Sequence, residues 1–260
     1  MADEELDTVL AGFTPVSLEA LDDRAALLRR VDSKYVLSPE ALVELLRRFA
    51  GDHDALEIDG RRRFAYRTVY FDTPELRTFH DHVAGRRPRF KLRTRCYLDN
   101  HRCQFEVKVK TTDDETDKRQ TDHRSDAEDE IGPAARRLID GALSDAGAEP
   151  IRDLRPVLVT GFQRFTLAAG GGGMRATCDL DLRLIRLDDG SQARLGDGRV
   201  VLETKSEDGD SAIDQALRDA GIDPVSMSKY RIGIDLLVEP DPSNETAELR
   251  RLFKREPPDA

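Results

Sequence analysis

The sequence has few cysteines and no long apolar run, and both shortages exclude classes of protein. No stretch of the 260 residues approaches the length of a transmembrane helix. The N-terminal residues, MADEELDTVL, lack the basic and then apolar layout of a secretion signal. The three cysteines, Cys96, Cys103 and Cys178, include no CxxC pair, which favours buried, idle thiols in a reducing cytoplasm over a disulfide or a zinc site. We therefore expect a cytoplasmic protein.

Basic residues are outnumbered overall but locally concentrated. The formal net charge is −10, from 41 Lys and Arg against 51 Asp and Glu. Residues 86–110 nevertheless hold nine Lys or Arg against Asp99 and Glu106, whereas residues 111–130 hold nine acidic residues against three basic ones. A general nucleic-acid binder would be basic overall or carry a broad basic face, so nucleic acid is not an expected partner. A cationic cluster inside an acidic protein favours a confined anion site.

The hydropathy pattern predicts a single α+β domain over residues 1–260, with helices around a large antiparallel sheet. Helices are expected over 17–30, 39–50, 133–146, 211–220 and 243–254. Strands are expected over 30–37, 64–71, 89–98, 101–110, 155–168, 174–185 and 199–205, with a short last strand at 228–230. The acidic segment 111–130 is predicted to be a mobile loop.

Several predicted strands place charge on one face. In KLRTRCY (91–97), Lys91, Arg93 and Arg95 share a face because side chains alternate along a strand. FEVKVK (105–110) aligns one acidic residue and two lysines in the same way. One interpretation is an antiparallel sheet with a solvated face. The other is a closed barrel of about eight strands with an ionic lumen. Like charges on neighbouring strands favour the second, since they are destabilising unless an anion lies between them.

A lumen with many cations and a few carboxylates would suit a polyphosphate chain together with a divalent metal. Arginine offers planar forks to phosphate oxygens, and lysine offers compact point charges. Carboxylates hold Mg²⁺ or Mn²⁺, which bridges phosphates.

Nine segments in a fixed order carry a family resemblance. They are RVDSKYVL (30–37), YRTVYFDTPEL (66–76), KLRTRCY (91–97), FEVKVK (105–110), Lys118-Arg119, VTGFQR (159–164), MRATCDLDL (174–182), VLETK (201–205) and SKYRIGI (228–234). With them the chain resembles the VTC domain, the catalytic domain of vacuolar transporter chaperone polyphosphate polymerases. That domain belongs to the triphosphate tunnel metalloenzyme superfamily, and the resemblance covers a core of about residues 24–235.

The resemblance implies an antiparallel β-barrel tunnel that binds ATP, triphosphate or polyphosphate with Mn²⁺ or Mg²⁺. It implies metal-dependent phosphoryl transfer as a polyphosphate polymerase, with an inorganic triphosphatase or NTPase and a non-catalytic binding module as the alternatives. The implied phosphate-binding residues are Lys34, Arg93, Arg95, Lys108, Lys118, Arg164, Lys205, Ser228 and Lys229. Lys34 and Lys229 are also the implied catalytic residues, and Glu203 is the implied metal ligand.

Two positions depart from the pattern that the resemblance implies. Asp32 stands where bacterial relatives usually have Glu, and Phe162 stands where the family usually has Tyr. Asp72, in YFDTPEL, is predicted to form the turn before Pro74, with a metal role as the alternative. Neither an SPX domain nor a membrane segment is recognisable, so the eukaryotic transport arrangement is not assumed, and a membrane or another protein stays open as a partner.

Overall fold

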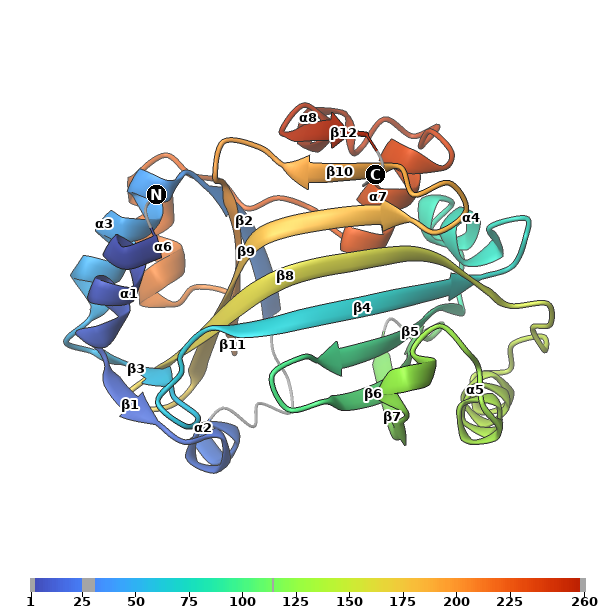
Figure 1. The fold of residues 1–260 in the computed structure, drawn as a ribbon, viewed down its shortest axis with the longest axis horizontal. Coiled ribbons are helices and arrows are strands. Elements are labelled where there is room, and N and C mark those ends of the chain that lie inside the picture. The colour runs from blue at the N-terminus through green and yellow to red at the C-terminus, as the bar shows by residue number, and fades with distance from the viewer. Residues whose placement is uncertain (1–2, 25–30, 114, 258–260) are drawn as a thin grey trace. The chain divides into compact units, whose positions relative to one another are not determined.

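The computed structural model describes residues 3–24, 31–113 and 115–257 (Figure 1). In these ranges the α-helices are α1 (Asp3–Ala11), α2 (Leu18–Arg24), α3 (Pro39–Phe49), α4 (Arg77–Val83), α5 (Pro133–Asp145), α6 (Ala212–Asp219), α7 (Lys229–Leu237) and α8 (Ala247–Arg250). The strands are β1 (Thr14–Val16), β2 (Val31–Leu37), β3 (His53–Leu56), β4 (Phe64–Asp72), β5 (Arg89–Tyr97), β6 (Arg102–Lys110), β7 (Thr116–His123), β8 (Arg155–Ala169), β9 (Met174–Arg186), β10 (Gln192–Leu195), β11 (Val200–Ser206) and β12 (Phe253–Glu256). A short 3-10 helix, η1 (Ser125–Ala127), follows β7.

The strands form one mostly antiparallel sheet, which confirms the α+β prediction. The main order is β12-β10-β9-β8-β4-β5-β6-β7, while β11 pairs with β2 and β9, and β3 pairs with β1 and β8. Among the described residues no pairing joins the end strands β7 and β12, so these pairings leave the sheet open. A closed barrel therefore stays a prediction.

The described chain divides into two compact units. Unit 1 comprises Met1–Phe64, Phe162–Leu182 and Leu195–Ser226, and unit 2 comprises Ala65–Gly161, Arg183–Arg194 and Met227–Ala260, each without its undescribed residues. The long strands β8 and β9 contribute residues to both units.

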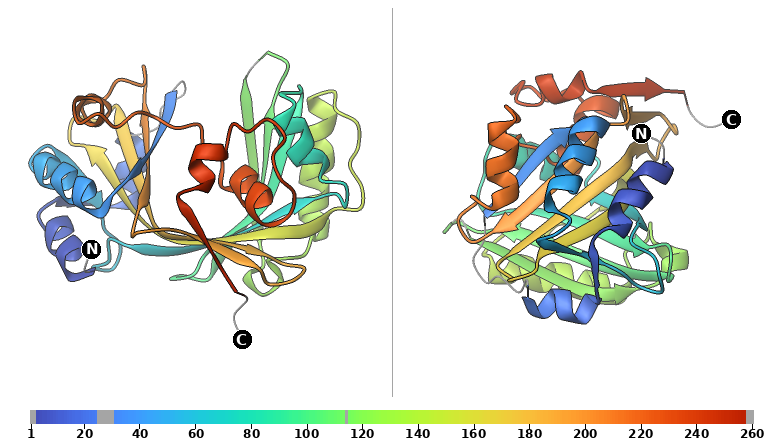
Figure 2. Two further views of the ribbon diagram at one scale, coloured as in Figure 1. Left: turned by 90° about the horizontal axis from the view of Figure 1, so that it is seen from above. Right: turned by 90° about the vertical axis from the view of Figure 1, so that its left-hand side faces the viewer.

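Unit 1 is built on helices that pack against β2, β9 and β11. Ser38 caps α3 by accepting a hydrogen bond from the backbone of Ala41 at 3.2 Å, and Pro39 fits the first helical turn. The apolar side of α3 is buried with Leu6 and Leu10 of α1 and with the apolar side of α6. Figures 1 and 2 show α1, α3 and α6 side by side. This packing leaves the polar sides of β2 and β11 for the residues described below.

Unit 2 buries the apolar faces of β5 and β6 under α5 (Figure 1). Leu92 and Val107 are paired in register and lie in one core cluster with Ile139 of α5. Exposure alternates residue by residue along β5, which confirms that Lys91, Arg93 and Arg95 share the opposite face. The sequence pattern therefore predicted correctly both the strand and which of its residues face the core.

Three expected elements differ from the structure. The segment 111–130 is not a loop throughout, because its residues Thr116–His123 form β7, which pairs with β6. Residues 228–230 are not a strand, because Ser228 caps α7 and Lys229 begins it. The helix expected over 243–254 contains only α8 and is followed by β12. The helix expected over 17–30 is described only as α2, and residues 25–30 lie outside the described ranges, as does Arg30 of the strand expected over 30–37.

The cysteine prediction is wrong for two of the three residues. Cys96 and Cys103 lie opposite each other in the β5–β6 pair and form a disulfide. Cys178 is a free, buried thiol, as expected. The argument from idle thiols for a cytoplasmic location therefore no longer holds, and that location stays a prediction. In the part of the chain that the structure describes, no helix has the length and apolarity needed to cross a membrane.

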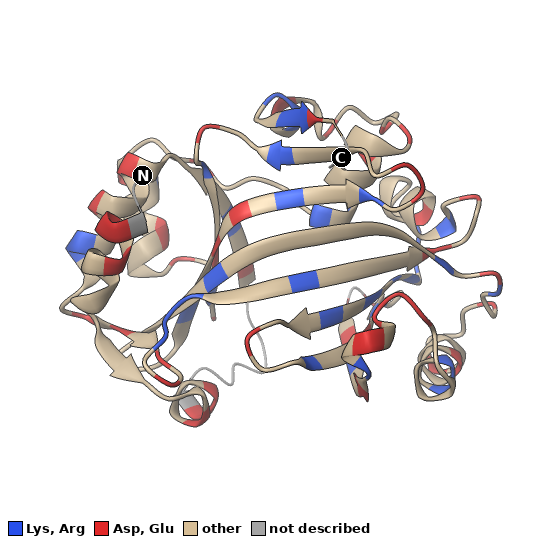
Figure 3. Cartoon of the chain, in the orientation of Figure 1, with Lys and Arg blue, Asp and Glu red and all other residues tan. Residues whose placement is uncertain are grey.

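Figure 3 shows where the two signs of charge lie. Acidic segments gather on α1 and α2, whereas basic segments recur along strands of the sheet. The excess of negative charge in the sequence is thus carried largely outside the cationic strand faces.

Candidate functional site

In unit 2 the pairing register arranges one strand face into cross-strand rows. One row runs from Lys91 of β5 through Lys108 of β6 to Lys118 of β7. It contains three lysines and no acidic residue. Directly opposed like charges destabilise a sheet unless a counter-ion lies between them, and for Lys118 that counter-ion is Glu106.

The next row is centred on a buried carboxylate, Glu106, which is only 2% exposed. Arg93, its register partner, donates from Nε to Glu106 Oε2 at 2.7 Å. Lys118 Nζ lies 3.0 Å from Glu106 Oε1, and Arg95 Nη1 lies 3.9 Å from the same oxygen. One carboxylate thus gathers three of the predicted phosphate-binding cations. We identify Glu106 as their internal counter-ion, a role that sequence reasoning missed.

The cations around Glu106 strongly favour its charged form. Burial alone would raise the pKa of Glu106, but the charges of Arg93, Arg95 and Lys118 outweigh burial and lower that pKa from 4.5 to about 2. The carboxylate is therefore ionised at neutral pH and balances part of the positive charge of this face.

The depressed pKa predicts a pH-dependent contribution to stability. The stabilisation by Glu106 should be fully present above pH 4.5 and should be lost as the pH falls through about 2. At about 1.4 kcal/mol per pKa unit it amounts to about 3 kcal/mol. Glu106→Gln should therefore destabilise the protein at pH 7, and the deficit should shrink as the pH is lowered. Urea unfolding at pH 3, 4, 5 and 7 measures this.

The control for this prediction is Glu248→Gln, at an exposed position of α8. It should leave the free energy of unfolding and its pH dependence close to those of the parent protein. A deficit in Glu106→Gln that stays constant between pH 5 and pH 3 would contradict the assigned pKa.

The first turn of α7 lies next to the lysine row. Lys91 Nζ donates to Ser228 Oγ at 3.0 Å. Ser228 Oγ also accepts from the backbone N–H of Arg231 at 3.4 Å, which is how it caps α7. Lys229 is the first residue of this helix. The correction from strand to helix therefore keeps Ser228 and Lys229 beside a cationic row, and it adds Lys91, which the family resemblance did not single out.

A buried hydrogen-bond network holds this turn in position. The Tyr230 hydroxyl is buried and donates to Asp72, and burial followed by the Asp72 charge raises its pKa well above the ordinary value. Asp72 also accepts from the Thr78 hydroxyl at 2.8 Å and from the backbone N–H groups of Thr73, Thr78 and Phe79. Both oxygens of Asp72 are thus engaged in fixing α4 and α7. Asp72 is a structural anchor rather than a simple turn former.

Unit 1 carries a second charged cluster, on β2, β9 and β11. One row contains Lys34, Glu203 and Thr177, and the next contains Asp32, Lys205 and Arg175. Lys205 Nζ contacts Glu203 and lies 3.2 Å from Asp32 Oδ2, while Lys34 Nζ lies 3.8 Å from Glu203 Oε1. Two of the predicted site residues, Lys34 and Lys205, therefore both contact a third, Glu203.

The charge state of Glu203 follows from these neighbours. Burial opposes its ionisation, but the positive charges of Lys205, Lys34 and Arg164 outweigh burial and hold the pKa of Glu203 far below its usual range. Glu203 is therefore a carboxylate at neutral pH, which is the form that a metal ligand needs.

Arg164 is held in unit 1 by a bidentate pair with Asp179. Its Nε and Nη2 donate to the two carboxylate oxygens at 2.5 Å and 2.9 Å. The Arg164 guanidinium also lies 5.1 Å from the centre of the Phe162 ring. Where the family usually has Tyr, the ring of Phe162 thus still supports Arg164 by a cation–π contact.

The carboxylates of unit 1 suit a metal that is completed by substrate oxygens. Among the described residues no group of three or more His, Cys, Asp or Glu is arranged to hold a metal ion. Asp32 and Glu203, however, both reach the Lys205 ammonium, so two carboxylates converge on one cation. Mg²⁺ is usually bound by one or two carboxylates together with water and phosphate oxygens. The shorter Asp32 thus still contributes a carboxylate to this cluster.

The predicted site residues fall into one group in each unit. Unit 1 holds Lys34, Arg164, Glu203 and Lys205, and unit 2 holds Arg93, Arg95, Lys108, Lys118, Ser228 and Lys229. Within each unit the strand residues are connected by ion pairs or by the strand register, while Ser228 joins through its hydrogen bond with Lys91 and Lys229 follows it at the start of α7. It adds Asp179 and Glu106 as partners that the sequence did not reveal, because those contacts depend on which strands are neighbours.

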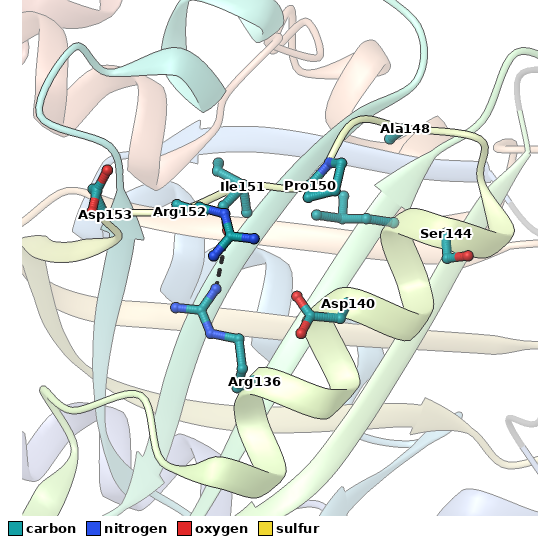
Figure 4. A pocket seen from close by; sticks show the side chains of 9 residues that line it. Arg136, Asp140, Ser144, Ala148, Pro150, Ile151, Arg152 and Asp153 are labelled. Atoms are coloured by element: carbon teal, nitrogen blue, oxygen red, sulfur yellow. Dashed lines mark hydrogen bonds between the residues drawn. The ribbon is translucent and has the colours of Figure 1, made fainter.

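A pocket beside α5 contains none of these residues (Figure 4). Its volume is about 870 Å³, and its lining includes Arg136, Asp140 and Arg152. Arg136 is engaged by the backbone carbonyl of Ile151 at 3.1 Å (Figure 4). The pocket lies between α5 and the segment 148–153, and none of its lining residues belongs to the charged strand faces.

The fold and its charged faces define an α+β protein with cation-rich strands. Among known families, the model of the VTC domain matches residues 29–238. The chain therefore belongs to the VTC domain family, which confirms the resemblance drawn from the sequence motifs. No curated protein is a significant match.

Solved structures show a more distant likeness. HpAC1 from Hippeastrum, described as an adenylyl cyclase candidate with a dominant triphosphatase activity, is 15% identical, with 78% of this chain and 94% of that chain covered and a TM-score of 0.46. The PH1819 protein from Pyrococcus horikoshii OT3 is 11% identical, with 79% and 98% covered and a TM-score of 0.45. We base no functional conclusion on these likenesses.

Proposed function

We propose that this VTC domain protein transfers phosphoryl groups from a nucleoside triphosphate and acts as a polyphosphate polymerase. The observation that carries the proposal is the row of Lys91, Lys108 and Lys118 beside the start of α7. Lys91 and Lys108 are directly opposed beside Lys118, whose counter-ion is Glu106, and a chain of phosphates supplies one charge after another along such a face.

Phosphoryl transfer needs positioning and neutralisation of charge rather than covalent chemistry from the protein. Arg93 and Arg95 present guanidinium groups that can bind phosphate oxygens in a bidentate manner. Lys229 and Lys34 supply compact charges for the transferred group and the leaving group. Glu106 and Asp179 hold the arginines in place before the substrate binds, so the site is preorganised.

The metal in this proposal is Mn²⁺ or Mg²⁺, held by Glu203 with Asp32. When bound, it would neutralise charge on the phosphate oxygens. Lys205 lies between the two carboxylates and must release them for a metal to bind, which leaves its ammonium available to a phosphate.

We further propose that residues 1–260 act as one VTC-like tunnel domain with its core over about residues 24–235. The family match over residues 29–238 covers most of that core and supports this. A closed barrel, a cytoplasmic location and any protein or membrane partner stay predictions from the sequence.

Lys229 gives a sharp test of the catalytic assignment. Lys229→Ala and Lys229→Leu should fold with a near-normal melting temperature, because Tyr230 and Ser228 still anchor the turn. They should bind nucleotide through the remaining cations but lose turnover about 100-fold, the usual effect of removing one electrostatic contact to the transition state. Lys229→Arg, which keeps the charge, is the control and should retain part of the activity.

Tripolyphosphate should raise the melting temperature of the parent protein, because a ligand that binds only the folded state stabilises it. That increase should shrink in the Lys229 variants without vanishing. A Lys229→Ala protein with parental turnover would show that this residue has no part in the reaction.

The activity itself is tested with the purified protein, ATP and either Mn²⁺ or Mg²⁺. Gel electrophoresis detects long-chain polyphosphate, and a colorimetric assay detects free phosphate. Long-chain product is the expected result. Free phosphate without chains would indicate a triphosphatase, and binding without any product would indicate a non-catalytic module; either outcome would overturn the polymerase proposal.

A further inference from the structure

Two tyrosines lie at one end of the cationic face of unit 2. Tyr66 of β4 and Tyr97 of β5 are register partners, and their ring centres are 5.0 Å apart at an angle of 60°. Both residues are partly exposed. Tyr97 alternates in phase with Arg93 and Arg95 along β5, and Tyr66 is its register partner on β4, so both rings stand on the same face as the guanidinium groups. The pair therefore forms an aromatic corner beside a phosphate-binding row.

The opposite end of the same face lies at the start of α7. Lys91 contacts Ser228 there, and Tyr97 follows Lys91 by six residues along β5. At about 3.4 Å per residue the two ends are about 20 Å apart. Arg93 and Arg95 occupy the strand between them. This spacing matches an extended nucleoside triphosphate, with a base at one end and a terminal phosphate at the other, and it exceeds what inorganic triphosphate needs.

A buried hydroxyl between these ends also points to a ligand. Thr68 of β4 is 1% exposed and is the register partner of Arg95. Two residues further along β4, Tyr70 is the register partner of Arg93. Thr68 Oγ1 has no hydrogen-bond partner among the described residues. Buried hydroxyls are normally satisfied, so an unsatisfied one on a charged face indicates a missing polar partner. The ribose of a nucleotide offers hydroxyl groups that could pair with it.

We propose that Tyr66 and Tyr97 form a nucleobase subsite, in which the base of the nucleoside triphosphate stacks on the exposed side of one ring while its phosphates extend past Arg95 and Arg93 toward Lys229. The inference rests on the proposed function, since it assigns the nucleoside end of that same substrate. Aromatic stacking tolerates every base, because each base presents a π face. The subsite should therefore favour nucleoside triphosphates over inorganic triphosphate without strict selection among bases.

The competing explanation is that the two tyrosines form a cross-strand pair that only stabilises the sheet. Such a pair would affect the melting temperature when it is removed, and it would alter the binding of ATP and of tripolyphosphate by the same factor. A nucleobase subsite would affect ATP alone. Comparison of the two ligands therefore separates the explanations.

The experiment is calorimetric titration of the full chain with ATP and, separately, with inorganic tripolyphosphate, both without metal so that no turnover occurs. Tyr66→Leu and Tyr97→Leu keep apolar bulk but remove the ring, and Tyr66→Phe and Tyr97→Phe keep the ring. We expect each Leu variant to bind ATP about tenfold more weakly, the effect of losing one stacking contact. Binding of tripolyphosphate should change by less than about twofold, and the Phe variants should stay close to the parent for both ligands.

Equal factors for ATP and tripolyphosphate, or unchanged ATP affinity in both Leu variants, would overturn the subsite while leaving the proposed phosphate chemistry intact. Failure of the parent protein to bind either ligand would overturn the proposed function and the subsite with it. The Phe variants keep the test informative if a Leu variant does not fold, since loss of ATP selectivity in a folded Phe variant would also contradict stacking as the mode of binding.

Discussion

Arg95→Ala and Arg93→Ala should each weaken the binding of tripolyphosphate about 10- to 100-fold, the cost of losing a charge-assisted hydrogen bond in a partly buried site. Both side chains are largely shielded from solvent, with 15% and 25% exposure, and both pair with Glu106. When one arginine is removed, the other and Lys118 still pair with Glu106, so the fold should persist. Calorimetric titration measures the affinity, and the melting temperature reports the fold.

The control is Arg137→Ala, on the exposed side of α5. It removes the same charge from the protein but lies away from the strand face, so its effect on affinity should be less than about twofold and should fade with added salt. Parental affinity in both strand variants would support the simpler interpretation of a solvated sheet face and would remove these arginines from the site.

Glu203→Gln should reduce turnover with Mn²⁺ or Mg²⁺ at least about 100-fold, because the amide cannot replace the charged ligand of a divalent cation. Binding of tripolyphosphate without metal should persist or become tighter. Lys34 and Lys205 both contact Glu203, and the substitution leaves both lysines while removing the negative charge that they balance. Turnover and metal-free binding should thus change in opposite directions, which simple damage to the fold would not produce.

Glu207→Gln is the matched control, since Glu207 follows β11 and is exposed. It should retain parental turnover and binding. If Glu203→Gln keeps full activity with metal, then Glu203 serves only as the counter-ion of Lys34 and Lys205, and the metal ligand must be sought elsewhere.

The strands of the cationic face were predictable because each combines an apolar side with a charged one. Leu92 alternates with Lys91 and Arg93, and this period-two pattern can be recognised without knowing which strands lie beside β5. β7 was missed because both of its faces are polar: it is the edge partner of β6 and buries no apolar row. For that reason the acidic segment that contains β7 was predicted to be a loop.

The start of α7 was assigned to the wrong element because the helix is buried along almost its whole length. A helix that is buried on all sides, with Arg231 and Asp235 among its buried residues, shows no clear apolar stripe, so the three residues around Lys229 could be interpreted as a strand. The residues themselves were still chosen correctly as neighbours of other cations, since Ser228 contacts Lys91.

The features that the sequence could not reveal all depend on strand register. The disulfide joins Cys96 and Cys103 only because the β5–β6 pairing places them opposite each other. Glu106 gathers cations from the two neighbouring strands, β5 and β7, and Asp179 holds Arg164 from the next strand of the sheet. A period-two pattern shows which residues of one strand share a face, but it does not show which residue of a neighbouring strand lies opposite each of them.

The central claim is that the cation-rich strand face of unit 2 binds a chain of phosphates. Titration of tripolyphosphate into the parent protein, into Arg95→Ala and into the control Arg137→Ala tests it most directly. We predict that the parent and the control bind with similar affinity, whereas Arg95→Ala binds about 10- to 100-fold more weakly. Parental affinity in Arg95→Ala would contradict the account, because the strand face would then take no part in binding.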